Sequence, residues 1–242
     1  MSQPTRMAFY DFDGTLVSSN VVLRYAYYVR KLPSRARALL KFSKLLLSVP
    51  VLVGLDFYSR RLFNETFFRE YRGMKKGWLL DRADSLFEDV IRPSIYSGAR
   101  SLVESDRDRG FRLVLVTGEL DFALGPVVRY FGFDDLISNA LVYENGTATG
   151  EVAAPLIAGG EKVAAMKRLS RLYNADTAES KAYSDSFSDA PMLEAVGNPI
   201  AVNPDWRLGR LAAQRGWPVM DLKRGDHVHV YPEGRDSGPA GV

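Results

Sequence analysis

The chain has 242 residues, of which 46% are hydrophobic and 25% charged, so it is neither a disordered nor a low-complexity protein. Its net charge is +3, and it contains two histidines and no cysteine, which excludes disulfides, thiolate metal sites and cysteine nucleophiles. The length suits one large domain, or one domain that carries a smaller inserted one, and carboxylates are left to perform any chemistry.

The predicted elements alternate between strands and helices along the chain. A buried strand over 7–12 ends at a glycine turn, and residues 20–92 then look helical throughout, broken by Pro33 and Pro50. A helix over 99–109 leads to a second buried strand over 112–118. The later predictions are a hairpin over 141–147 with an Asn-Gly turn, helix 161–173, strand 181–185, short helix 190–195, strand 199–202, helix 207–215 and strand 218–220.

This alternation predicts an α/β fold, a Rossmann-like doubly wound parallel sheet. The helical segment between the first two strands is too long for a simple crossover, so we expect an inserted helical cap. The predicted division is a catalytic core over 1–19 and 93–222, a cap over 20–92, and a C-terminal tail over 223–242. We expect the tail to be flexible because glycine, proline and charged residues dominate it.

The charge is concentrated in the predicted cap. Residues 24–76 contain thirteen lysines and arginines against three acidic residues, a net charge of +10, whereas residues 77–242 carry −6. Such a segment favours anionic substrates, membrane surfaces or nucleic acid. No recognised nucleic-acid-binding module accompanies it, so we expect no nucleic-acid partner.

The sequence offers no clear targeting signal. Its N-terminal apolar run ends at Asp11, which does not fit a signal peptide. The uncharged apolar stretch over 45–55 has eleven residues, whereas a spanning helix needs roughly 20. We therefore expect a cytoplasmic protein, which agrees with the lack of cysteine, and leave peripheral membrane contact open.

The apolar run Leu45–Leu55 has two interpretations. The favoured one is core packing inside the cap, against nearby phenylalanines at 57, 63, 67 and 68. The other is a patch that contacts anionic lipid, since Lys41, Lys44, Arg60 and Arg61 flank the run. A lipid-like phosphate substrate would suit the second interpretation.

Acidic residues follow the first strand at the edge where open α/β sheets bind ligands. Asp11 and Asp13 repel each other, and a divalent cation would relieve that cost. Other polar residues lie at the same predicted edge: Thr117 and Gly118 after the second strand, Lys162 at the start of a helix, and Asp185 with Asp189 after the third strand.

These residue types fit phosphoryl transfer, which depends mostly on positioning and charge neutralisation. A carboxylate can attack phosphorus and form an aspartyl-phosphate if cations such as Mg²⁺ and a lysine offset its repulsion from the phosphate. A second acid must protonate the departing alkoxide and then deprotonate the attacking water. The sequence therefore predicts a metal-assisted phosphoryl-transfer site.

At these positions the sequence resembles the haloacid dehalogenase (HAD) superfamily of phosphohydrolases. Its four motifs occur in order as Asp11-Phe-Asp13-Gly-Thr15-Leu, Val116-Thr117-Gly118, Lys162, and Ser184-Asp185-Ser186-Phe-Ser-Asp189. The insertion after the first motif and the form of the fourth resemble the phosphoserine-phosphatase-like subfamily IB. The resemblance implies a Rossmann-like core, a helical cap, Mg²⁺ and phosphate-monoester hydrolysis through a phospho-aspartate.

The resemblance also implies roles for the matching residues. Asp11 would be the nucleophile and Asp13 the general acid and base. The remaining implied roles are phosphate binding by Thr117, Gly118 and Lys162, and metal binding by Asp11, the Asp13 carbonyl and Asp185, with Asp189 nearby. From the residues alone, Lys167 and Lys181 compete with Lys162, and Asp189 could instead cap the next helix.

Two positions depart from phosphoserine phosphatases. Those enzymes carry a glutamate after the first motif that recognises the substrate amine, where this chain has Asn20, and usually Ser-Gly-Gly in the second motif, where it has Thr117-Gly118-Glu119. Both differences argue against phosphoserine, so we expect another small or amphiphilic phosphate ester. The candidate specificity residues are Asn20, Arg24, Arg60, Arg61, Arg69 and Glu119, the last being either a substrate contact or part of a solvated turn.

Two other functions fit part of the pattern. The chain could transfer the phosphoryl group to an acceptor alcohol in place of water. It could also be a non-catalytic, receiver-like module phosphorylated on Asp11, but a receiver needs neither a leaving-group acid such as Asp13 nor a cap.

Overall fold

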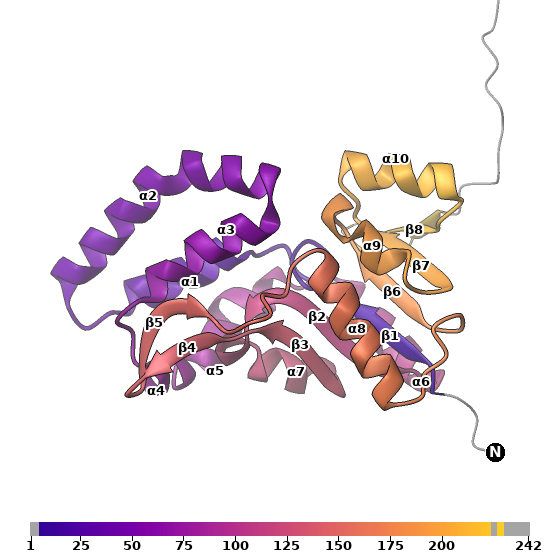
Figure 1. The fold of residues 1–242 in the computed structure, drawn as a ribbon, viewed down its shortest axis with the longest axis horizontal. Coiled ribbons are helices and arrows are strands. Elements are labelled where there is room, and N and C mark those ends of the chain that lie inside the picture. The colour runs from indigo at the N-terminus through magenta and orange to yellow at the C-terminus, as the bar shows by residue number, and fades with distance from the viewer. Residues whose placement is uncertain (1–4, 224–226, 230–242) are drawn as a thin grey trace, which may run out of the picture.

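The computed structural model describes residues 5–223 and 227–229. Within them, a seven-stranded sheet lies between layers of helices (Figure 1), with the strand order β3-β2-β1-β6-β7-β8-β9. Neighbouring strands are parallel except for β8 and β9. This confirms the predicted α/β, Rossmann-like fold. The strands are β1 (Met7–Tyr10), β2 (Arg112–Leu120), β3 (Asp135–Asn139), β6 (Lys181–Ser184), β7 (Asn198–Val202), β8 (Val219–Asp221) and β9 (His227–His229).

Successive residues of the central strands pack on opposite faces of the sheet. Met7 and Phe9 of β1 pack in one layer, with α8 (Gly160–Leu172), α9 (Ala190–Leu193) and α10 (Trp206–Arg215). Ala8 and Tyr10 pack in the other, with α6 (Ala99–Asp108) and α7 (Gly125–Phe131). Burial on both faces explains why these strands read as continuous hydrophobic runs.

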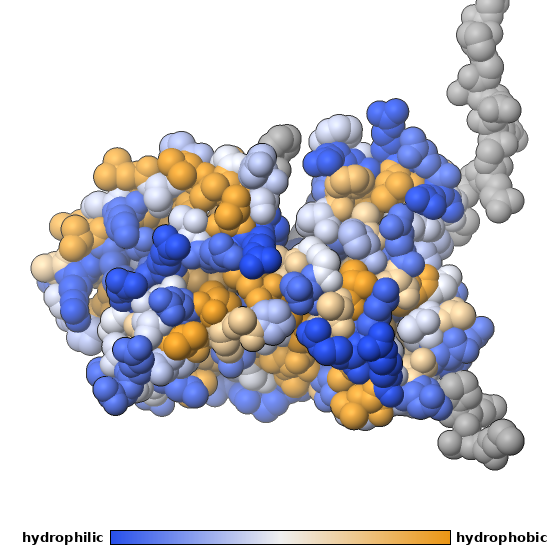
Figure 2. Space-filling model, viewed as in Figure 1, coloured by the Kyte–Doolittle hydropathy of each residue, from blue (hydrophilic) through white to orange (hydrophobic). Residues whose placement is uncertain are grey.

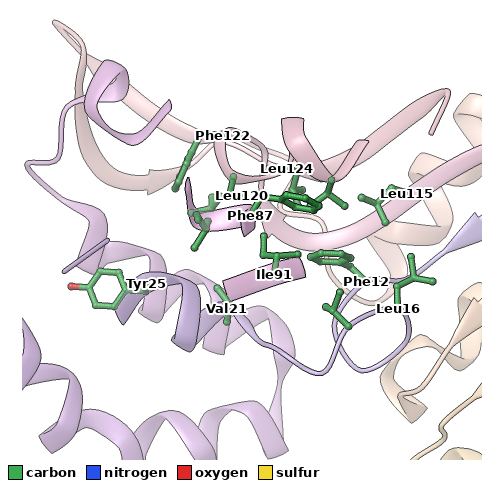
Figure 3. Packing of buried hydrophobic residues seen from close by; sticks show 14 of the residues in the cluster. Phe12, Leu16, Val21, Tyr25, Phe87, Ile91, Leu115, Leu120, Phe122 and Leu124 are labelled. Atoms are coloured by element: carbon green, nitrogen blue, oxygen red, sulfur yellow. The ribbon is translucent and has the colours of Figure 1, made fainter. Parts of the chain in front are cut away.

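The segment between β1 and β2 is helical, as expected. Its helices are α1 (Val21–Arg30), α2 (Arg35–Tyr58), α3 (Arg60–Phe67), α4 (Lys76–Leu80) and α5 (Ala83–Leu86), with the short turns η1 (Phe68–Tyr71), η2 (Phe87–Ile91) and η3 (Arg92–Ser94). Its buried side chains share one cluster with those packed on the sheet (Figure 3), in which Phe12 lies beside Ile91 of the insert. The hydrophobic interior therefore continues from the sheet into the insert.

Helix α2 differs from the expectation in two ways. It continues through Pro50, where a break was predicted. Proline leaves the carbonyl of Leu46 without its helical partner, but Leu46 is exposed, so water can bind there. The favoured interpretation of core packing is also wrong, because over residues 45–55 only Leu45 and Leu52 are buried among the side chains that the structure describes.

The length of α2 also corrects the earlier view of this segment. The helix is long and apolar enough over Arg35–Leu55 to cross a membrane, judged by length and composition alone, and 11% of its most apolar window is buried. The uncharged stretch of eleven residues understated the length of the apolar helix, because the helix begins before Lys41 and Lys44 and includes both. Core helices and signal sequences pass the same test, so it does not by itself assign a membrane span.

The predicted hairpin is present as β4 (Leu141–Glu144) and β5 (Thr147–Val152). Asn145 and Gly146 both have left-handed backbones, with φ of 48° and 69°, as a tight hairpin turn requires. The hairpin is joined to the insert by backbone hydrogen bonds: Gly73 N–H donates to Ala148 O (2.9 Å) and Ala148 N–H donates to Met74 O (2.8 Å). The insert therefore has a second contact with the chain, outside residues 20–92.

Sequence analysis missed β3 and α7. Strand β3 contains Asp135, Ser138 and Asn139 and lies at the edge of the sheet, so it lacks the hydrophobic run of a central strand. Strand β9 lies within the predicted tail and pairs with β8, while residues 230–242 of that tail lie outside the described part of the chain. The predicted division into core and cap stays a prediction.

Candidate active site

A tight turn after β1 carries the first two candidate residues. The Asp11 N–H donates to Tyr183 O (2.9 Å), which keeps Asp11 beside β6. Gly14 has a φ of +80°, and a Cβ there would lie 2.0 Å from Asp185 Oδ2. Glycine is therefore required at this position by both its backbone conformation and the close approach of Asp185.

Lys162 joins two buried carboxylates. Its Nζ donates to Asp11 Oδ1 at 2.6 Å and to Asp189 Oδ2 at 2.7 Å. Of its two competitors, Lys167 is exposed and Lys181 pairs with Asp106 instead. Burial opposes the charge of Lys162, but Asp11 and Asp189 together raise the pKa of its ammonium above the ordinary value. Lys162 is therefore held charged against the predicted nucleophile.

The Asp189 side chain binds Lys162 and does not cap the following helix. Its carboxylate accepts hydrogen bonds from Lys162 and from the Ser184 hydroxyl (3.0 Å). It occupies the N-cap position just before α9, but its side chain makes no capping hydrogen bond there. The alternative role as a helix cap is thus not the one that the geometry supports.

Asp11 and Asp185 face each other across the Thr15 hydroxyl, which lies 3.3 Å from a carboxylate oxygen of each. Burial raises the pKa of Asp11 to about 6, although Lys162 opposes this change. Burial, followed by the charges of Asp11 and Asp189, raises the pKa of Asp185 to about 8. The site therefore disfavours the ionised pair, and a divalent cation would relieve that cost.

These donors fit Mg²⁺, which prefers hard oxygen ligands. Among the described residues, no group of three or more acidic, histidine or cysteine side chains could hold a metal ion. A metal ion held by the carboxylates of Asp11 and Asp185 would therefore need a further donor, and the resemblance implies the Asp13 carbonyl for this role. The Asp189 carboxylate is committed to Lys162.

The Asp13 side chain is paired with Arg24 of α1. Arg24 Nη2 lies 2.5 Å and 2.6 Å from the two carboxylate oxygens of Asp13, and its Nε donates to Glu119. Arg24 is 1% exposed. Burial opposes its charge, but Asp13 and Glu119 raise the pKa of the guanidinium above its ordinary value. Arg24 thereby links the insert to the turn after β1 and to β2.

Glu119 is not part of a solvated turn, which was one of its two interpretations. It is buried, and burial raises the pKa of its carboxyl against the opposing effect of Arg24. Thr117, also buried, accepts a hydrogen bond from the Glu119 N–H at 3.1 Å. Glu119 therefore binds Arg24 from within the end of β2, next to Thr117.

A cavity of about 200 Å³ brings these segments together. The predicted site residues that line it are Asp11, Asp13, Thr117, Gly118, Glu119, Lys162, Asp185, Asp189 and Arg60. A wider cavity of about 940 Å³, lined by Asp106 and Trp217 among others, contains none of them. The smaller cavity is therefore the candidate active site.

Four specificity candidates do not line this cavity, and one of them is Arg24, which Asp13 and Glu119 bind. Asn20 instead caps α1, where its side chain accepts from the Val22 and Leu23 N–H groups at 3.1 Å. Arg61 pairs with Glu65 at 3.0 Å and lines a separate cavity together with Arg69. Adjacent helical residues point about 100° apart, so Arg60 and Arg61 cannot face the same way.

Asn64 is a site residue that sequence analysis missed. It lies one turn after Arg60 on α3, lines the same cavity and is buried, and its Nδ2 has no hydrogen-bond partner. The spacing of four residues from Arg60 could have identified it, because such residues share a helix face. Burying an amide without a hydrogen-bond partner costs free energy. The Asn64 Nδ2 is therefore suited to donate a hydrogen bond to a bound ligand.

The raised pKa values predict how metal binding changes stability. Both folded-state pKa values, about 6 for Asp11 and about 8 for Asp185, exceed the ordinary 3.8, so the folded protein holds these protons more tightly than the unfolded chain. Their stabilising contribution is full below about pH 4 and is lost as the pH rises through 6 and 8. We expect Mg²⁺ to raise the melting temperature more at about pH 8 than at about pH 5.

Thermal unfolding with and without Mg²⁺ measures this effect. Replacing Asp185 by asparagine should remove most of the shift that Mg²⁺ causes, because one of the two carboxylate ligands is gone. An equal shift at both pH values, or none, would contradict the assignment of these two carboxylates to the metal.

The chain is similar in sequence to known proteins. The pattern of the haloacid dehalogenase-like hydrolases matches residues 8–194. The chain is 32% identical to the "inhibition of morphological differentiation protein" of Streptomyces azureus over 226 residues, 92% of this chain and 80% of that one. It is 30% identical to a probable phosphatase of Mycobacterium tuberculosis over 223 residues, 90% of this chain and 75% of that one.

A solved structure shares the fold. A phosphoserine phosphatase, determined as an analogue of its phospho-aspartyl intermediate, matches with a TM-score of 0.68 at 15% identity, over 93% of this chain and 96% of that one. At this identity the likeness concerns the arrangement of helices and strands.

Proposed function

Because the chain belongs to the haloacid dehalogenase-like hydrolases, and to the phosphatases among them, we propose that it hydrolyses a small phosphate monoester with Mg²⁺ through an aspartyl-phosphate on Asp11. The observation that carries this proposal is the contact of Lys162 with Asp11 inside a cavity that Asp13 and Asp185 also line. The proposed nucleophile and acid in the turn after β1 thus line one cavity together with the lysine of α8 and with Asp185 after β6.

The first step transfers the phosphoryl group to the protein. A carboxylate oxygen of Asp11 attacks phosphorus, the bond from phosphorus to the ester oxygen breaks, and the Asp13 carboxyl gives its proton to the departing alkoxide. Lys162 offsets the negative charge that the phosphoryl oxygens bring beside Asp11. Thr117 and Gly118 line the same cavity and would hold those oxygens.

The second step releases phosphate. Asp13, now ionised, accepts a proton from a water molecule, whose oxygen attacks phosphorus while the bond to Asp11 breaks. This regenerates Asp11 and frees inorganic phosphate. Arg24, which binds both carboxylate oxygens of Asp13, fixes the orientation of that base. Mg²⁺, when held by Asp11, Asp185 and the Asp13 carbonyl, would neutralise part of the charge on the phosphate.

Phosphate release from a panel of amino-acid, sugar and amino-alcohol phosphates tests the proposal. We expect many turnovers per chain with Mg²⁺, loss of turnover when EDTA removes the metal, and recovery when Mg²⁺ is added in excess. No turnover on any member of the panel, or turnover that EDTA leaves unchanged, would count against it.

The same assay separates the two alternatives. A receiver-like module would release at most one phosphate per phosphorylated chain. A phosphotransferase would convert an added alcohol into its phosphate ester at the expense of free phosphate.

A cytoplasmic location also stays part of the proposal.

A further inference from the structure

An apolar groove opens beside the catalytic cavity. It has a volume of about 360 Å³ and lies between α1, α2 and α3. Its apolar lining includes Val21, Leu23, Val49, Leu52, Val53 and Phe63. Leu23 and Val53 are 52% and 63% exposed, so the groove presents hydrophobic surface to its contents.

The groove adjoins the site of the proposed chemistry. Val21 and Arg60 line both the groove and the catalytic cavity. The cavity is surrounded by charged and polar groups, whereas the groove is mainly aliphatic, so polarity changes across these two residues. A ligand with a phosphate at Asp11 and an apolar chain would match both sides of this boundary.

We propose that the groove binds the apolar chain of the substrate, whose class is then an amphiphilic phosphate monoester with an alkyl or acyl chain. This inference rests on the proposed function, because it places the phosphate of the same molecule beside Asp11. The bound alkyl or acyl chain would cover the exposed aliphatic side chains of the groove. This accounts for the presence of hydrophobic surface at this position.

Alkyl phosphates of increasing length test this inference. We would measure kcat/KM for butyl, hexyl and octyl phosphate as dissolved monomers with Mg²⁺. A fully buried methylene contributes about fourfold in affinity, so partial burial of four further methylenes should raise kcat/KM by about tenfold or more from butyl to octyl phosphate.

Two valine variants of the same helix locate the effect. Val53→Asp places a charge in the groove and should bring the octyl-to-butyl ratio close to one. Val51→Asp is the matched control, because Val51 is about equally exposed but does not line the groove. The ratio cancels any general effect of the added charge on phosphate binding.

The outcomes separate the two proposals. If the wild-type protein hydrolyses none of the three esters or the earlier panel, the proposed function fails. If it hydrolyses all three equally well, the groove proposal fails while the proposed function stands. If Val53→Asp keeps the wild-type ratio, the chain binds elsewhere and the groove proposal is overturned.

A separate observation concerns the outer face of α2. Figure 2 shows hydrophobic residues gathered over this helix. Leu40 and Leu47 are 71% and 81% exposed, and further exposed leucines lie at 39 and 46. A contiguous apolar surface of this kind marks an interaction site in most proteins.

The charge of α2 indicates the partner. Residues 35–55 contain four lysines and arginines and no acidic residue. Lys44 pairs with Glu70, but Arg35 and Arg37 are exposed at the start of the helix. Basic side chains beside an apolar helix surface favour anionic lipid. From this surface we infer that α2 docks on an anionic bilayer.

The helix would lie on the bilayer and not cross it. Helix α3 begins directly after α2, and its Arg60 and Asn64 line the catalytic cavity. The C-terminal end of α2 is therefore fixed beside the active site, and Leu52 in its last turns is buried. To cross the bilayer, α2 would have to move away from the residues that pack against its C-terminal end.

Co-sedimentation with vesicles tests the docking. We expect the full chain to bind phosphatidylcholine vesicles that contain about 30% phosphatidylglycerol, and to bind pure phosphatidylcholine about tenfold or more weakly. The double variant Leu46→Asp/Leu47→Asp should lose about tenfold or more in binding, whereas Leu172→Asp, an exposed leucine of α8, should bind as wild type. No binding, or equal binding to both vesicles, overturns the inference. A dimer in solution that the double variant abolishes, without vesicle binding, assigns the face to a second copy instead.

Discussion

Replacing Asp11 by asparagine should lower phosphate release by about 10⁴-fold or more while the protein stays folded. Asparagine has nearly the same shape, but its amide is not a nucleophile for phosphorus. Lys162 keeps Asp189 as a partner, so the variant leaves no buried charge unpaired. Steady-state phosphate release and circular dichroism on the same samples measure the two parts of this expectation.

A surface aspartate supplies the control. Asp84 is exposed and pairs with Arg129, so Asp84→Asn makes the same chemical change far from any predicted role. It should leave turnover unchanged. Retained turnover in the folded Asp11→Asn variant would refute the assignment of the nucleophile.

Replacing Arg24 by methionine should lower the free energy of unfolding by about 3–5 kcal/mol. Methionine keeps most of the apolar contacts of the side chain but removes the charge that Asp13 and Glu119 share. Glu119 is then a buried carboxyl without a cation, whereas Asp13, which is less buried, is partly solvated. Urea unfolding at neutral pH measures the loss.

Two variants control for this effect. Arg92→Met removes an exposed arginine that pairs with Glu88, and should leave the free energy of unfolding nearly unchanged. Adding Glu119→Gln to Arg24→Met should recover part of the lost stability, because the unpaired carboxyl is then neutral. A variant Arg24→Met as stable as wild type would mean that the pairing does not hold the insert to the core.

The fold and the centre of the site were predictable because their signals are local. A buried strand followed by Asp11, Asp13 and Gly14 specifies a turn at a sheet edge within a few residues. Parallel strands then bring distant segments to that edge, so Lys162 and Asp185 could be expected near Asp11 before their contacts were known.

The orientation of the specificity candidates was not predictable in the same way. Helical periodicity identifies α3, but only its packing determines that Arg60 and Asn64 face the cavity while Arg61 faces elsewhere. Likewise, the basic residue Arg24 looked like a substrate contact, and only the fold shows that Asp13 and Glu119 already bind it.

Hydrophobicity alone also misled the interpretation of α2. An apolar run is compatible with a protein core, a lipid surface or another subunit, because the same solvation energy drives all three. The sequence does not show whether other side chains, lipids or a second subunit will contact the run. Only the position of α2 at the outside of the insert separates the protein core from the other two cases.

The pairing of Gly73 and Met74 with Ala148 limits how this protein can be rebuilt by recombination. Excising residues 20–92, or swapping them for the same segment of a relative, would strip one side of β5 of its main-chain partners and leave an edge open to aggregation. A transplantable module would therefore have to comprise two stretches of the gene, one for the helices and one for residues 141–152.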